Sequence, residues 1–293
     1  MKSVFINNLV SDMKLQGFYL CIEKRIRRKR DGSPYIDLLL QDKSGVIRAR
    51  IWDNVNKLIK KFDTGDPIVL KGATYSYGDN LFIKIKNINR ASVDKYKKYG
   101  FEPANLIPPS KLNAKQLWVQ LQKEIKTISK PHFKKLVTKI LSDHKQKFQI
   151  YPASISFHYN YQHGLLEQTV SLIKIAKLLA KNYVVNSDLL LTGACLHQIG
   201  KLYSINVGFS DEKNDSKKLL GNAILSRDIV NKYISEIKKF PEDDKIQLEH
   251  LILSYQGRRE WQSPIEPQTI EAMLLHTINY MDSHINFMSK DEE

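Results

Sequence analysis

The sequence predicts a two-domain protein of mixed class, in which a five-stranded β-barrel precedes an all-α domain. Three observations support this prediction. Residues 17–88 alternate short apolar segments with turn signals, residues 92–110 contain three prolines, and later segments have apolar residues at helical spacing. At 293 residues, the chain is long enough for each domain to bury its own core. We therefore place the barrel at residues 1–92, a connector at 93–110 and the helical domain at 111–293.

The barrel is predicted from short strands separated by glycine-containing turns. Asp31-Gly32 is a strong hairpin signal, and Gly65-Asp66-Pro67 and Gly78-Asp79-Asn80 also indicate turns. Five strands within about 75 residues leave little room for long helices and favour a small closed barrel. The predicted strands are residues 17–24, 35–42, 46–52, 68–75 and 81–88.

The helical domain is predicted to begin after the Pro108-Pro109 pair, which disfavours a continuing helix. Within residues 111–147, apolar side chains recur every three or four residues, at Leu117, Leu121, Ile125, Phe133, Leu136 and Ile140. These segments are rich in lysine. Their lysines either extend a basic surface or simply face solvent, and both interpretations stay open.

The positive charge of the chain is concentrated in its first half. Residues 1–92 hold 18 Lys and Arg against 9 Asp and Glu, and residues 93–150 hold 13 against 4. Residues 151–293 reverse the balance, with 15 against 18. A uniformly lysine-rich surface would spread its charge evenly. The asymmetry instead indicates a polyanionic partner for the first half, and nucleic acid is the usual one.

Candidate nucleic-acid-binding residues lie on the outer faces of the predicted strands and in the first hairpin. Arg48, Arg50 and Trp52 alternate with apolar residues, and so do Phe82, Lys84 and Lys86. Cations can meet phosphates while rings stack on unpaired bases, although an ordinary solvated face would show the same pattern. Six cations within seven residues of the first hairpin favour a phosphate-contacting loop: Lys24, Arg25, Arg27, Arg28, Lys29 and Arg30.

Two groups of motifs resemble a known family. The first comprises DLLLQDKSGVIRARIWD and GDPIVLKG, and the second comprises FHYNYQHGLLEQT and DLLLTGACLHQIGK. Together they resemble the YhaM-like 3′–5′ exoribonucleases, in which an OB-fold precedes a helical HD domain. The resemblance extends from about residue 4 to residue 288. It implies that the barrel is an OB-fold and that the helical domain has an HD-like core, which normally holds divalent metals with histidines and aspartates.

The resemblance also implies a degenerate metal site. GLLEQT has Gln168 where the family pattern has a histidine, and LHQIGK has His197-Gln198 in place of a His-Asp pair. The positions implied for the whole site are Gln168, His197, Gln198, Asn222, Tyr255, Gln256 and Asn279. Neutral amides keep size and hydrogen bonding but remove the charge that a hard divalent cation requires. We therefore expect no catalytic residues, no metal ligands and no cofactor.

Other residues near these motifs allow two alternatives. Asp282 lies three residues after Asn279, and histidines at 158, 163 and 276 flank the motifs, so a non-standard ligand set holding manganese or magnesium stays open. His197, Lys201, Arg258 and Arg259 could instead hold a phosphate without metal, or be ordinary structural and exposed residues. We expect a non-catalytic protein that binds single-stranded RNA or DNA. An active 3′–5′ exonuclease is the alternative.

The remaining features bound the setting of the protein. No apolar run approaches the roughly 18 residues that a membrane span needs. The first residues do not resemble a secretory signal, and Cys21 and Cys195 lie far apart in apolar surroundings, as buried free thiols of a reducing compartment do. We expect a cytoplasmic protein without a membrane partner. It could form a homo-oligomer or pair with a nucleic-acid-processing machine.

Overall fold

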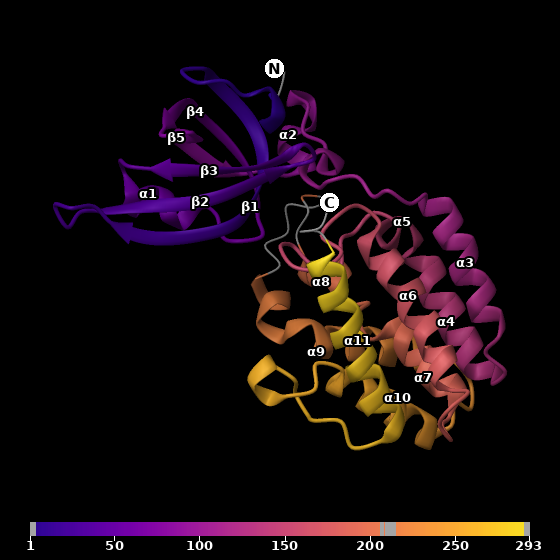
Figure 1. Cartoon of the computed structure of the whole chain (residues 1–293). Helices are drawn as coiled ribbons and strands as arrows, with labels where there is room; N and C mark the ends of the chain where they lie inside the picture. Colours follow the sequence, from indigo (N-terminus) through magenta and orange to yellow (C-terminus); the bar gives the residue numbers. More distant parts are fainter. Residues whose placement is uncertain (1–3, 206–207, 209–214, 290–293) are drawn as a thin grey trace. The chain divides into compact units, whose positions relative to one another are not determined.

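The computed structural model describes residues 4–205, 208 and 215–289, and the chain divides into two compact units. The first unit extends to Pro109 and also includes Ile205 and Gly208, and the second begins at Ser110. The backbone N–H of Val93 donates to the carbonyl of Gly208 over 3.1 Å, which ties the later segment to the first unit. Figure 1 shows a β-unit and an α-unit, as the sequence predicts.

The first unit is a closed five-stranded barrel, which confirms the predicted fold class. Its strands follow the order β1-β2-β3-β5-β4, and β4 pairs with β1 to close the sheet. The β3–β5 pair is parallel and the other pairs are antiparallel. The strand bounds are β1 Lys14–Arg28, β2 Pro34–Asp42, β3 Gly45–Ile51, β4 Pro67–Tyr77 and β5 Asn80–Arg90.

Alternating side chains fill the barrel. Ile47, Ala49 and Ile51 are buried in the core, whereas Arg48 is exposed and Arg50 is half-buried on the opposite face of β3. The hairpin turns contain Gly32 and Gly78, with φ of 81° and 58°, a backbone region that favours glycine. The period-two pattern therefore fixes which residues of β3 face outward.

Residues 93–109, predicted as a connector, pack on the barrel as part of the first unit. The ring of Phe101 lies 5.0 Å from that of Phe18, and the N–H of Lys43 donates to the carbonyl of Asn105 over 2.8 Å. The short helices of this unit are η1 Ile6–Asn8, α1 Val55–Leu58, η2 Ile59–Lys61, α2 Val93–Tyr96, η3 Lys97–Tyr99 and η4 Pro103–Leu106.

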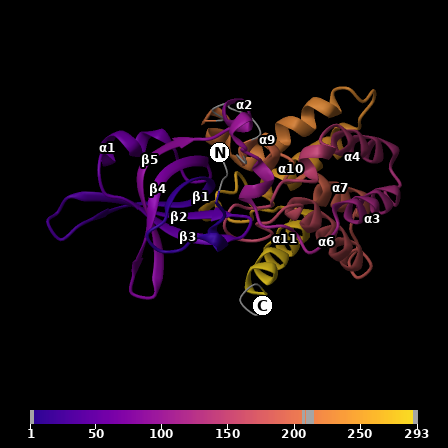
Figure 2. The same ribbon diagram turned by 90° about the horizontal axis from the view of Figure 1, so that it is seen from above.

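The second unit is a helical bundle in which α7 packs against α4, α6, α10 and α11 (Figures 1 and 2). The helices are α3 Ala114–Lys126, α4 Pro131–Asp143, α5 Lys145–Phe148, α6 Gly164–Leu179, α7 Ser187–Leu196, α8 Lys201–Ser204, α9 Asp215–Ile234, α10 Glu242–Ser254, η5 Arg259–Trp261 and α11 Ile270–Met288. Every residue of α7 from Leu189 to Leu196 is buried. Gly193 lets α10 approach, because an added Cβ there would lie 2.7 Å from Leu251. In the described residues, no helix has both the length and the apolar character required to cross a bilayer.

Candidate functional sites in the barrel and the helical unit

The outer face of the barrel carries three arginines around one aspartate. Asp37 of β2 is only 6% exposed, because the guanidinium groups of Arg27, Arg48 and Arg50 lie 3.2, 3.4 and 3.5 Å from its carboxylate oxygens. Asp37 and Arg50 face each other in the β2–β3 register. One carboxylate neutralises only one of three cations, so the cluster keeps a net positive charge. Asp37 thus holds the arginines in place on a positive surface.

Aromatic rings flank this cluster in two stacked pairs. Tyr35 and Trp52 have centroids 4.6 Å apart, and Tyr75 and Phe82 have centroids 5.6 Å apart. The Arg50 guanidinium lies 4.4 Å from the Phe82 centroid and 5.6 Å from that of Trp52, so it bridges both pairs. Cations interleaved with rings are what a single-stranded nucleic acid meets in its binding sites.

Sequence reasoning missed Tyr35 and Tyr75, although both leave a signal. Tyr35 lies two residues before Asp37 and therefore on the same face of β2. Tyr75 lies opposite Phe82 in the β4–β5 register. That register follows from the Gly78 turn. Phe82 is itself only 6% exposed and lies beneath Arg50 and Tyr75, so it supports this face and offers little free ring surface.

The cations of the first hairpin do not share one role. The Lys24 ammonium donates to the carbonyl of Ile59 over 2.7 Å and pairs with Asp63 at 3.2 Å, so it already has partners within the barrel. A bulge between Cys21 and Glu23 shifts the β1 register just before it. Arg25 pairs with Glu23 at 3.1 Å, and Lys29 lies 5.7 Å from the Trp52 centroid.

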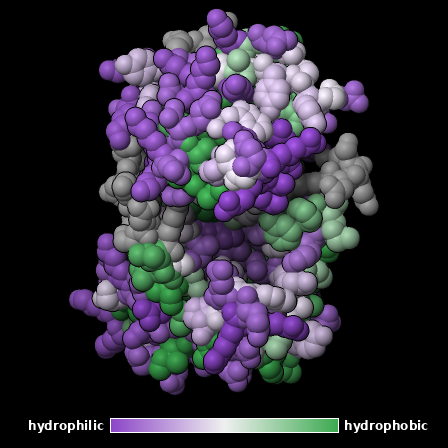
Figure 3. Space-filling model, turned by 90° about the vertical axis from the view of Figure 1, so that its left-hand side faces the viewer, coloured by the Kyte–Doolittle hydropathy of each residue, from purple (hydrophilic) through white to green (hydrophobic). Residues whose placement is uncertain are grey.

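The other predicted cations lie on the surface of the barrel. Arg28, Arg30, Lys84 and Lys86 are exposed. Figure 3 shows the protein from the side toward which the β1–β2 hairpin projects in Figure 1. The surface in the upper part of this view is largely hydrophilic.

In the helical unit, three of the amides singled out by the resemblance meet. Gln168 of α6 and Gln198, which follows α7, both donate from Nε2 to Asn279 Oδ1 of α11, over 3.3 and 2.9 Å. Gln168 Nε2 also donates to Ser283 Oγ over 3.0 Å. Gln168 is fully buried and Gln198 is 4% exposed. We call these three residues the amide cluster.

His197 and Lys201 are buried in the same motif. His197 Nδ1 lies 3.1 Å from the carbonyl of Gly193. Because a carbonyl oxygen only accepts, Nδ1 carries the proton and donates the hydrogen bond. Burial lowers the pKa of Lys201 to about 7, and burial together with the nearby Lys201 charge lowers the pKa of His197 to about 4. Gly200 allows the backbone of α9 to approach, since an added Cβ there would lie 2.6 Å from the Asn222 carbonyl.

The remaining positions are distributed around these residues. Tyr255 packs edge-on to His197 with centroids 4.9 Å apart, and Gln256 lines a cavity beside it. Asn222 instead accepts a hydrogen bond from Ser204 Oγ. Arg258 and Arg259 are exposed. Asp282, the candidate substitute ligand, accepts a hydrogen bond from Ser171 Oγ over 2.5 Å, and burial raises its pKa.

The amide cluster does not fit a divalent metal ion. Its shared oxygen, Asn279 Oδ1, already accepts two N–H groups, and Gln168 Oε1 is a single buried neutral oxygen without a hydrogen bond. Hard divalent cations require anionic oxygens or several imidazoles. Within the described ranges, no group of three or more His, Cys, Asp or Glu residues is arranged to hold a metal ion.

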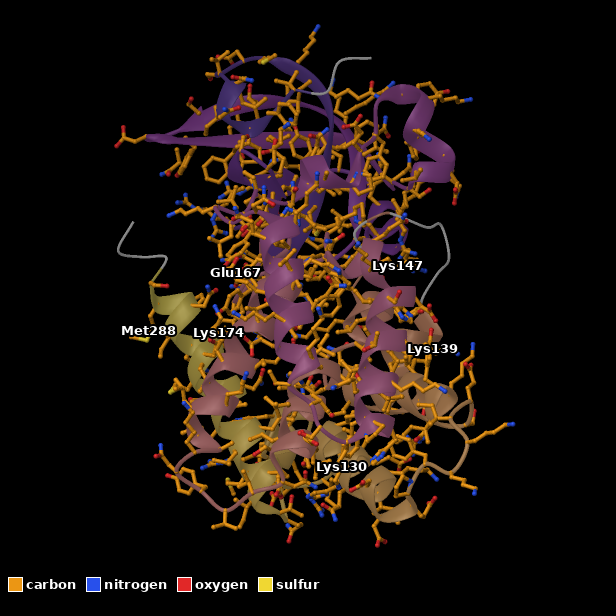
Figure 4. The ribbon with its side chains drawn as sticks, turned by 90° about the vertical axis from the view of Figure 1, so that its right-hand side faces the viewer. Lys130, Lys139, Lys147, Glu167, Lys174 and Met288 are labelled. Carbon is orange, nitrogen blue, oxygen red and sulfur yellow. The ribbon has the colours of Figure 1, made fainter. Side chains whose placement is uncertain are left out.

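The lysine-rich helices α3–α5 are partly neutralised. Lys130 pairs with Asp244 at 2.9 Å, Lys139 pairs with Glu236, and Lys147 lies 4.9 Å from the Tyr203 centroid. In Figure 4 these three lysines follow one side of the helical unit, from the beginning of α4 to α5. Two of these three lysines are therefore paired with acidic side chains of the same unit.

Acidification should destabilise the helical unit through His197. Its pKa is about 4 when folded and 6.5 ordinarily, so as pH falls below 6.5 the unfolded chain takes up a proton that the folded chain does not. The contribution of His197 to the free energy of unfolding is complete above pH 6.5. It declines as pH falls toward 4, by about 3 kcal/mol in total. In urea unfolding across this pH range, the free energy of unfolding should fall more steeply for the wild type than for His197→Asn. An equal fall in both proteins would show that His197 is not the group responsible, because the variant keeps every other titrating group.

Comparison with known proteins finds relatives both for the barrel and for most of the chain. Residues 20–90 match a family described as an OB-fold nucleic acid binding domain. The 3′–5′ exoribonuclease YhaM of Listeria welshimeri is 28% identical over 275 residues, covering 93% of this chain and 86% of that protein. The YhaM protein of Listeria monocytogenes is also 28% identical, over 261 residues. A solved OB-fold domain of replication protein A from Methanococcus maripaludis covers 30% of this chain at 20% identity, with a TM-score of 0.26.

Proposed function

We propose that this chain, which is similar to the YhaM 3′–5′ exoribonucleases over 93% of its length, binds single-stranded RNA or DNA through its barrel. Because neutral amides occupy the positions where metal ligands are expected, we propose that it does not hydrolyse the strand. The barrel is an OB-fold of the nucleic-acid-binding type. The helical unit, on this proposal, is an HD-like domain that has lost its metal chemistry and serves as a scaffold or docking body. We place the protein in the cytoplasm, where such a strand partner would be found.

The barrel supplies the affinity. Arg27, Arg48 and Arg50 offer two net positive charges to backbone phosphates after Asp37 is counted. The Tyr35–Trp52 pair offers ring surface to an unpaired base, which is worth about 1–3 kcal/mol for each base stacked. Phosphate contacts release counterions, so binding should weaken steeply with salt.

The amide cluster is the single observation that carries the proposed loss of catalysis. Two amide N–H groups converge on Asn279 Oδ1, where metal chemistry would require an electron-rich oxygen facing the ion. In its protonated form, the buried Lys201 adds positive charge near His197 and opposes a divalent cation. His197 is then the one imidazole among the seven positions that the family resemblance assigns to the site.

An active metal-dependent 3′–5′ exonuclease is the second candidate, and the similarity to exoribonucleases over most of both chains favours it. It would need manganese or magnesium held by a ligand set outside the amide cluster. A third arrangement, in which the protein oligomerises or partners a nucleic-acid-processing machine, is compatible with either candidate.

A gel assay separates the first two candidates. End-labelled single strands of RNA and of DNA are incubated with the purified chain, with and without manganese, and read for retardation and for shortening. We expect retardation that weakens steeply with salt and intact strands in every lane. Manganese-dependent shortening from the 3′ end that is lost in His197→Ala would overturn the proposal in favour of the enzyme.

A further inference from the structure

A cavity of about 440 Å³ opens beside the amide cluster in the helical unit. The cavity is lined by Asn279, a member of the cluster, by Ser283, which accepts a hydrogen bond from Gln168, and by Gln256. The rest of the lining is aromatic or imidazole, and no aspartate or glutamate is part of it. Its size lies within the range of about 300–1,000 Å³ typical of small-molecule sites.

The rings of this cavity form a column. Trp261 and Tyr280 are stacked with centroids 5.3 Å apart and an interplanar angle of 9°, and the Tyr280 and His284 centroids are 4.0 Å apart. Phe157 lies edge-on to His284, with centroids 5.2 Å apart and an interplanar angle of 76°, and so ends the column. Tyr280 and His284 are four residues apart on α11 and so share a helix face. Trp261 and Tyr280 are 41% and 44% exposed, which leaves ring surface open to a ligand.

Polar groups with fixed hydrogen-bonding roles surround this column. His284 Nδ1 lies 2.7 Å from the Tyr280 carbonyl, and His276 Nδ1 lies 3.1 Å from the Tyr255 carbonyl. Each Nδ1 therefore donates to a carbonyl, which leaves Nε2 of the neutral ring as an acceptor. Gln256 adds an amide with both donor and acceptor atoms. At the outer end of the column, the Arg258 guanidinium lies 5.2 Å from the Trp261 centroid.

We propose that this cavity binds one unpaired nucleobase, which packs against the Trp261–Tyr280–His284 column. A flat ring with donors and acceptors on its edge matches stacked aromatic rings beside amide and imidazole groups. Arg258, exposed at the end of the column, meets the phosphate of the same nucleotide. The inference rests on the proposed function, and it gives the helical unit a binding role that needs no metal ion. The base comes either from the end of a strand or from a free nucleotide.

Photochemical cross-linking of the full chain tests this inference. A single strand with 5-iodouridine at its 3′ end is irradiated in complex with the protein, and the labelled peptides are identified by mass spectrometry. We expect labels on Trp261 or Tyr280. Tyr280→Leu should reduce this labelling at least fivefold, whereas Tyr280→Phe, which keeps the ring, should retain it. The matched control is Tyr183→Leu, because Tyr183 is an exposed ring outside the cavity, and it should leave labelling unchanged.

The outcomes separate this inference from the proposed function. Strand binding with labels only on barrel residues, or labels in the cavity that Tyr280→Leu does not reduce, would overturn the inference and leave the barrel's role intact. No strand binding at all would overturn the proposed function itself. Competition by free uridine monophosphate at concentrations comparable to the strand would identify a free nucleotide as the source of the base, and its absence would identify the strand end.

Discussion

Replacing Arg48 and Arg50 together by glutamate should weaken single-strand binding by at least about 100-fold near physiological salt. Two positive charges become negative beside Asp37, so the cluster changes from net attraction to net repulsion of phosphate. The change at Arg50 also removes the cation over the Phe82 ring and leaves Trp52 with Lys29 as its neighbouring cation. Fluorescence anisotropy over a salt series measures both effects. The slope of log affinity against log salt should become shallower by about 0.7 for each phosphate that the protein no longer neutralises.

A matched charge change tests whether position matters. Lys14 and Lys71 are exposed on β1 and β4, away from the arginine cluster, and their double change to glutamate alters the net charge by the same amount. We expect only a small reduction of affinity from that control. The milder pair Arg48→Gln and Arg50→Gln, with thermal unfolding measured alongside, distinguishes impaired binding from impaired folding. If both charge-reversed proteins bind equally weakly, the arginine cluster is not the strand-binding surface.

Changing Gln168→His, Gln198→Asp and Asn279→Asp together should create manganese binding, with about one ion per chain. The three side chains already meet at Asn279 Oδ1, so the substitutions place an imidazole and two carboxylates around one point next to His197. Isothermal titration measures the binding directly. The midpoint of thermal unfolding should also rise with manganese, because an ion at 100 times its dissociation constant stabilises the folded state by about 2.7 kcal/mol.

The control is the triple alanine variant of the same positions, which removes the amides without supplying ligands. It should gain no manganese binding and no manganese-dependent rise in unfolding temperature. A folded His-Asp-Asp variant that binds no manganese would show that these positions are not the former ligand site. Manganese-dependent shortening of a strand by that variant would link the pocket to hydrolysis.

Much of the barrel could be predicted from the sequence, because period-two alternation and turn residues are local signals. The five strands and the outward direction of Arg48 and Arg50 follow from them. Lys24 could not be placed this way, because the bulge before it is a feature of strand pairing. The role of Asp37 was equally hidden, since its three partners come from two different strands and meet only in the folded sheet.

In the helical unit, apolar spacing predicted the segments of α3 and α4, whereas only the family resemblance supplied the positions of the amide cluster. Gln168, Gln198 and Asn279 lie far apart in sequence, yet they form one cluster. The hydrogen bonds within the cluster could not be read from the resemblance. The ring column was missed altogether, although the four-residue spacing of His276, Tyr280 and His284 along α11 was visible. Trp261 joins it only through tertiary packing.

The shared oxygen of the amide cluster also has an evolutionary consequence. Because Asn279 accepts from both glutamines, a change that removes its acceptor oxygen takes away the acceptor of the buried Gln198 amide, at a cost of about 1–3 kcal/mol. Asn279→Asp keeps an oxygen that accepts both N–H groups, whereas Gln198→Asp replaces an N–H donor by a carboxylate beside the Asn279 oxygen, so the order of these changes matters for stability. Mutations at these three positions are therefore epistatic. A return to acidic ligands at these positions would therefore depend on which of the three residues changes first.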